Sequence, residues 1–230
     1  MQCTIGGVRP TGVGNIATVE FRDDGRYEIT CPKGHTSITI LQQQKFELLF
    51  DIGAFAITDG YYREAVSSFT SSLERFYEFF IKAVLFEKAT DEAAVVNSWK
   101  AIARQSERQL GAFIILYTSE FGRSPTLLGE RQVQFRNEVI HRGKIPSAQE
   151  ALAYGQVVLD LIRPLLREAK ERYPKGVNKT VFDHMAQGRQ SPTERSGTMS
   201  IPTIVSLNIA DETWDKRSLE QAIKELRRWG

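Results

Sequence analysis

The fold is constrained most by a long region, from about Gln42 to Tyr173, in which apolar residues follow a helical period. The segment from about Tyr61 to Phe86 shows this pattern most clearly. Its apolar residues recur at steps of three and four: Ala65, Phe69, Leu73, Phe76, Phe80 and Val84. This spacing places them on one face of a helix. Because such residues are usually buried, we interpret the stripe as core and not as the lining of a ligand cleft.

Polar and glycine-containing breaks divide this region into successive helices. The sequence predicts helices over about 42–57, 61–86, 91–121, 127–141 and 147–173, with a bend or a break in the polar stretch 104–109. Gly143 fits a left-handed cap after the fourth of these helices. Ser147 and Glu150 have the spacing of a capping box, so they mark the start of the fifth. The chain is therefore expected to be mainly α-helical.

Residues 1–41 are expected to form a small antiparallel β-meander. Apolar and polar residues alternate from Ala17, and Asp24-Gly25 between alternating runs is typical of a hairpin turn. Pro32-Lys33-Gly34 marks a second turn. Three short strands are not stable alone, so they should pack on the helices or hold a metal.

The C-terminal part has a different composition. Residues 175–200 are rich in Gly, Ser, Thr, Gln and Arg, which predicts a linker or mobile loop. Residues 204–209 have the pattern of a strand, and 214–229 that of a helix with a basic end. The expected organisation is a β-region at 1–41, a helical bundle at 42–174, the linker at 175–200 and a strand-helix appendage at 201–230.

Composition excludes several classes of protein. The formal net charge is only +2, so the chain has no global cationic field, and any RNA site must be a local patch. Two cysteines, Cys3 and Cys31, do not make a disulfide framework. The chain starts without a signal-peptide pattern, and no run approaches 18 apolar residues. We expect a cytoplasmic protein with no membrane partner.

A cluster of polar residues lies at the end of the predicted helix 127–141. It contains Arg136, Asn137 and His141. Asn137 and His141 are four residues apart and share a helix face. Arg136 and His141 are five apart, so their side chains diverge by roughly 140°. One helix cannot close both around a small target, whereas two copies across a two-fold axis can, which favours a homodimer.

The arginine, the polar residue after it and the histidine four positions beyond that resemble the R-x4-H signature of the HEPN superfamily. The resemblance covers the motif and, more loosely, the helical region from Gln42 to Tyr173. It implies a HEPN-like antiparallel helical bundle and a metal-independent endoribonuclease that works as a dimer without a cofactor. One HEPN branch has a modified Tyr two residues after the His. Gly143 stands there, so that regulation is not implied. A role in toxin or antiviral defence systems is implied only loosely.

The motif has suitable chemistry for cleaving RNA through its own 2′-hydroxyl. His141 is the natural base or acid, since imidazole titrates near neutral pH. Arg136 suits the phosphate, because its planar fork binds two oxygens at once. Asn137 can orient the imidazole or contact the phosphate. The expected RNA-binding cations are Arg131, Arg142 and Lys144.

Two other interpretations remain open. Histidine and arginine are also favoured at a helix C-terminus by the dipole, which fits a non-catalytic HEPN-like dimerisation or interaction module. Such a module would recruit a protein partner through the N-terminal hairpin or the C-terminal appendage. A third interpretation is a zinc-bearing nucleic-acid-binding adaptor. It rests on Cys31 and His35 as metal ligands with Cys3 as a third, and no fourth ligand is evident.

Overall fold

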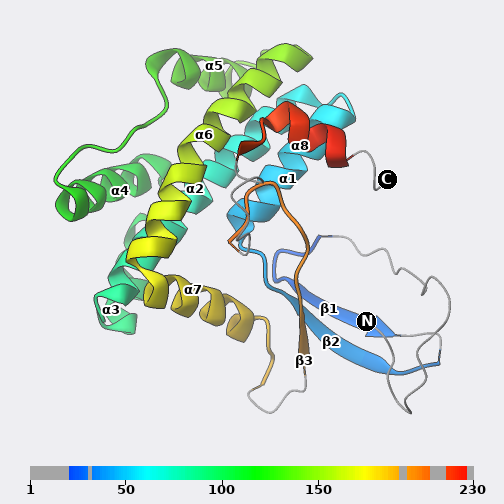
Figure 1. The fold of residues 1–230 in the computed structure, drawn as a ribbon, viewed down its shortest axis with the longest axis vertical. Coiled ribbons are helices and arrows are strands. Elements are labelled where there is room, and N and C mark those ends of the chain that lie inside the picture. Colours follow the sequence, from blue (N-terminus) through cyan, green and yellow to red (C-terminus); the bar gives the residue numbers. More distant parts are fainter. Residues whose placement is uncertain (1–20, 31–32, 192–195, 208–215, 227–230) are drawn as a thin grey trace. The chain divides into compact units, whose positions relative to one another are not determined.

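The computed structural model describes residues 21–30, 33–191, 196–207 and 216–226. Within these residues the chain forms eight helices and three strands (Figure 1). It divides into two compact units. The first contains residues 1–42 and 182–201, and the second contains residues 43–181 and 202–230. The expectation of a mainly helical chain with a small sheet is confirmed.

The larger unit contains nearly all of the helical residues. Its helices are α1 (Lys45–Thr58), α2 (Tyr62–Glu87), α3 (Glu92–Ile102), α4 (Ser106–Phe121), α5 (Glu130–His141), α6 (Ala148–Arg172), the first part of α7 (Pro174–Gln187), and α8 (Leu219–Leu226). The expected break in the polar stretch 104–109 separates α3 from α4, and α5 begins three residues later than predicted. Pro164 lies inside α6.

Helix α2 is the centre of this unit, since it packs against α1, α4, α5 and α6. Its aromatic stripe is buried, as expected: Phe69, Phe76 and Phe80 are fully shielded from solvent. Phe80 packs edge-on against Phe113 of α4, with ring centres 5.4 Å apart. The rings of α2 therefore form the core of the bundle and line no ligand cleft.

The smaller unit contains a three-stranded sheet. Strands β1 (Arg26–Thr30) and β2 (Thr36–Leu41) are antiparallel, and the expected turn between them has Gly34 at a φ of +79°. The third strand is β3 (Ser196–Met199), which pairs with β2 in parallel. Two of the three strands expected for the N-terminal meander are therefore present as β1 and β2, and the sheet gains β3, which the sequence did not predict. The strand expected at Ala17 lies outside the described residues.

The segment 175–200 is not a linker. It contains most of α7 as well as β3. Gly176 anchors the start of α7 to α2. Its N–H donates to Glu87 Oε2 at 2.8 Å, and its Cα lies against the backbone of α2. Helix α7 crosses the division between the two units at Val181.

The predicted strand at 204–209 is also wrong over its described part. Ile204 and Leu207 are buried but lie in irregular backbone. Two carboxylates of α1 accept the backbone hydrogen bonds that a neighbouring strand would otherwise accept. Asp51 Oδ1 accepts the N–H of Ile204 at 3.0 Å, and Glu47 Oε1 accepts the N–H of Leu207 at 2.9 Å. The buried backbone donors are thus satisfied by side chains and not by a sheet.

Candidate functional site at the end of α5

The end of α5 has the cap that its sequence predicts. The N–H of Lys144 donates to the carbonyl of Glu138 at 3.0 Å, so the chain after the helix satisfies one of its last carbonyl groups. Gly143 supplies the left-handed residue at a φ of +74°. Ser147 and Glu150 then form the expected capping box at the start of α6. This short, well-defined loop fixes the position of His141 and Arg142 at the helix end.

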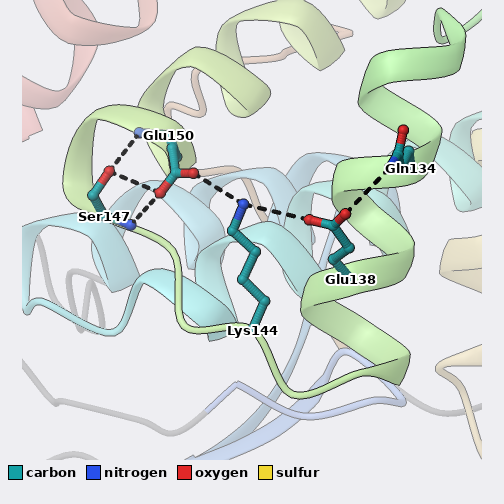
Figure 2. A network of polar contacts seen from close by, with 5 residues as sticks. All are labelled: Gln134, Glu138, Lys144, Ser147 and Glu150. Atoms are coloured by element: carbon teal, nitrogen blue, oxygen red, sulfur yellow. Dashed lines mark hydrogen bonds and ion pairs between the residues drawn. The ribbon is translucent and has the colours of Figure 1, made fainter.

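A network of polar contacts joins the two helix ends (Figure 2). Lys144 Nζ lies 3.5 Å from Glu138 Oε2 and 3.1 Å from Glu150 Oε1. Hydrogen bonds from Ser147 and Lys144 hold the pKa of Glu150 at about 2, and Glu150 in turn raises the pKa of Lys144. Lys144 also lies 4.9 Å from the centre of the Phe135 ring. Its charge is shared with two carboxylates, so its contribution to a cationic patch is reduced.

Arg136 lies on the bundle-facing side of α5. It is half-buried, and its Nε is buried and makes no hydrogen bond to any residue that the structure describes. The positive charge of Arg136 acts to lower the pKa of Glu74 in α2 and of Tyr154 in α6. Burial raises the pKa of Glu74, and Arg75 and Arg136 oppose that shift. The guanidinium is therefore directed toward α2 and α6 of its own chain.

His141 lies on a different side of the helix. It is exposed, as is Arg142, while Asn137 is half-buried. Asn137 and Arg142 line a groove of about 430 Å³ whose other walls are Leu128, Glu130, Val133 and Gln134. Since Asn137 and His141 are one turn apart, the imidazole leaves the helix on the same face as the groove. The structure thus brings Asn137 and Arg142 together in one groove, whereas His141 is exposed and is not among the residues that line it, and Arg136 lies apart.

Arg131 belongs to a second, smaller pocket on the other side of α5. This pocket has a volume of about 220 Å³ and is lined by Phe135 and Tyr154, among others. The two rings lie 5.7 Å apart at an angle of 47°. The hydroxyl of Tyr154 contacts Thr70 Oγ1 at 2.9 Å in the core. The six site residues expected from the sequence are therefore not gathered in one place. Asn137 and Arg142 line one pocket, Arg131 lines another, and Lys144 belongs to the salt-bridge network. Arg136 is half-buried against the bundle, and His141 is exposed.

Two of the three expected zinc ligands are not among the residues that the structure describes. Cys3 and Cys31 are not among the described residues, and His35 is exposed in the β1–β2 turn. Over the described ranges there is no group of three or more His, Cys, Asp or Glu side chains able to hold a metal ion. The zinc site stays a prediction.

Sequence reasoning missed a basic pocket between α6 and α8. Arg163 and Arg167 line it from α6, and Lys216 and Arg217 from the segment before α8. The spacing of the two α6 arginines, four residues apart, was the available signal. It could not reveal that two residues from fifty positions further along the chain lie opposite them.

None of the described helices combines the length and apolar composition needed to cross a lipid bilayer. Comparisons with protein-family models, with curated proteins and with solved structures found no match. The fold and the site geometry are thus the basis for any functional conclusion.

Proposed function

We propose that this protein is a metal-independent endoribonuclease of the HEPN type. The observations that carry the proposal are the surface groove along α5, which Asn137 and Arg142 help to line, and the exposed His141, which follows Asn137 by one helical turn. An RNA phosphodiester at this groove would meet an imidazole, an amide and a guanidinium together. The resemblance of Arg136-Asn137-x3-His141 to the HEPN signature supports the same assignment.

His141 is the acid–base group in this mechanism. It takes the 2′-hydroxyl proton or donates one to the leaving 5′-oxygen, and positioned catalysis of this kind contributes about 10²–10⁴-fold. Arg142 binds the phosphate oxygens and stabilises the charge that develops on them, as a guanidinium does well. Asn137, one turn before His141, orients the imidazole. A second copy of the chain supplies the other proton-transfer group, since each chain offers one such histidine.

Arg136 has two possible roles. The HEPN resemblance assigns it to the phosphate, whereas its side chain lies toward Glu74 and Tyr154. An Arg136→Ala variant separates the two roles. If Arg136 contacts substrate in a dimer, cleavage falls while the free energy of unfolding is unchanged. If it stabilises the bundle, the free energy of unfolding falls as well.

The test uses the purified full chain, single-stranded RNA and EDTA throughout. We expect cleavage products with 2′,3′-cyclic phosphate ends, and we expect His141→Ala and Arg142→Gln to lose at least about 10²-fold in rate. Arg108→Gln, which removes an exposed arginine of α4, is the matched control and should cleave like the wild type. Full activity of the His141→Ala variant would contradict the proposed mechanism. Loss of activity in EDTA with recovery in Mg²⁺ would indicate another site.

A second candidate function is a non-catalytic interaction module. The observation in its favour is Ile145, which is 82% exposed in the loop directly after the motif. Contact with a partner would remove this apolar side chain from water, which favours association. Light scattering of Ile145→Ser measures this. A dimer that needs Ile145, combined with no RNA cleavage by the wild type, would favour the module.

A further inference from the structure

The groove along α5, which we call the α5 groove, carries a negative charge at one end and a positive charge at the other. Its volume is about 430 Å³. Most of its lining residues recur at steps of three and four along α5, so they share one helix face. In chain order the lining residues are Leu128, Glu130, Val133, Gln134, Asn137 and Arg142. At about 1.5 Å per residue, Glu130 and Arg142 lie about 18 Å apart along the helix axis.

The charges at the two ends of the α5 groove are not neutralised within the described part of the chain. Glu130 and Arg142 are both exposed, and their side chains make no hydrogen bond or ion pair with any residue that the structure describes. Glu138, further along α5, differs because it accepts hydrogen bonds from Gln134 and Lys144 (Figure 2). A ligand in the groove therefore meets one group that only accepts hydrogen bonds and one that only donates them.

These charges decide which part of an RNA strand can lie at each end of the groove. Arg142 attracts a backbone phosphate, because its guanidinium can bind two oxygens at once. A phosphate beside Glu130 would face a like charge, which is unfavourable. Leu128 and Val133 are half-buried and offer apolar surface against which the flat face of a base can pack. The Glu130 end is therefore suited to a base and not to a phosphate.

We propose that the α5 groove selects an RNA base with an exocyclic amino group at its Glu130 end and discriminates against uracil there. This inference rests on the proposed function, since it requires RNA in the groove. An ionised carboxylate only accepts hydrogen bonds. Cytosine and adenine each offer it an amino group. Uracil has a carbonyl oxygen where cytosine has its amino group, and the carboxylate repels that oxygen.

Glu130 is the specificity-determining residue in this arrangement. Gln134 and Asn137 cannot make the same distinction, because a carboxamide carries both donors and an acceptor and can bond to cytosine or to uracil. Glu130 lies about 17 Å from His141 along the helix axis, at about 1.5 Å per residue. The selected base therefore belongs to a neighbouring nucleotide, and Glu130 takes no part in proton transfer at the cleaved bond.

Fluorescence anisotropy with the full-length His141→Ala chain tests the inference, because this variant should bind RNA without cleaving it. Labelled oligocytidylate and oligouridylate of equal length are the probes, and the ratio of their dissociation constants is the readout. Both strands carry the same number of phosphates, so the general electrostatic attraction cancels in the ratio. We expect oligocytidylate to bind about ten-fold more tightly. A single cytidine moved along oligouridylate locates the selected base.

The Glu130→Gln change in the same background should bring this ratio close to one, because a glutamine can donate to the uracil oxygen. Glu64→Gln is the matched control, since it removes an exposed carboxylate of α2 that does not line the groove. It should keep the ten-fold ratio, even if both RNAs bind more tightly to the less negative chain. Glu130 also stands in the first turn of α5, where a carboxylate stabilises the helix. Loss of that role alone would not change the ratio.

Three results would overturn the inference alone, provided that the wild type cleaves RNA. They are equal or tighter binding of oligouridylate, a ratio unchanged by Glu130→Gln, and a ratio lost equally in Glu64→Gln. If neither strand binds, the inference also fails. Cleavage of mixed RNA by the wild type then decides whether the proposed function fails with it.

Discussion

Replacing Asp51 by asparagine should reduce the pH dependence of stability that the buried carboxylates of α1 impose. Asp51 is 4% exposed, and burial raises its pKa from 3.8 to about 7. Glu47, one turn earlier, is raised to about 7 by burial as well. Both accept N–H groups of the segment Ile204–Leu207. These carboxyls are therefore protonated in the folded chain at a pH where they are ionised in the unfolded chain.

The sign of the effect follows from this difference. A folded-state pKa above the unfolded value means that the folded chain binds more protons, so the contribution to stability is present at low pH and is lost as pH rises from about 4 to 7. For Asp51 alone, each pH unit in that window costs about 1.4 kcal/mol. Between pH 5 and pH 8 the loss is about 3 kcal/mol, since the slope ends near the folded pKa of about 7.

Urea denaturation followed by circular dichroism measures this at pH 5 and pH 8. Asp51→Asn keeps a carbonyl oxygen for the N–H of Ile204 and removes the ionisation. The free energy of unfolding of the variant should therefore rise relative to the wild type by about 2–3 kcal/mol between the two pH values. Glu64→Gln, an exposed carboxylate of α2, is the control and should show no such change. A difference between Asp51→Asn and the wild type that is the same at both pH values would refute the reasoning.

Two further substitutions test the packing of the helical unit. In Gly176→Ala the new Cβ would stand 1.8 Å from the backbone oxygen of Ala83, so α7 must shift, and urea denaturation should show a loss of about 3 kcal/mol. Tyr154→Phe removes the buried hydroxyl contact to Thr70 and should cost about 1 kcal/mol, because Thr70 keeps its bond to the Val66 carbonyl. A stable Gly176→Ala chain, or a Tyr154→Phe loss above about 3 kcal/mol, would contradict these arguments.

The parts of the fold that depend on local chemistry were predictable from the sequence. Gly143 and the Ser147–Glu150 pair ended one helix and began the next as expected, because caps involve neighbours a few residues apart. The α2 stripe was correctly read as core for a similar reason. Apolar residues that recur every three to four positions lie on one helix face, and this is the face that is buried.

The errors arose where distant segments decide the structure. The pairing of β3 with β2 joins Ile40 to Thr198, and no local pattern identifies a partner so far along the chain. Polar composition at 175–200 predicted a linker, yet Glu87 and the Gly176 backbone anchor a helix there. Buried Ile204 and Leu207 had a strand pattern, but side-chain carboxylates satisfied their N–H groups instead of a neighbouring strand.

The same distinction applies to the candidate site. Helical geometry alone separated Arg136 from His141, and the structure agrees, because Arg136 lies toward Glu74 while His141 is exposed. What sequence could not supply was the groove, which needs Leu128 and Glu130 at the other end of α5 as walls beside Asn137 and Arg142. Within one chain, Arg142 is therefore the guanidinium placed to meet a phosphate at the groove. Arg136 can contribute there only from a second copy or after leaving its buried position, which makes its substitution the most informative one for the mechanism.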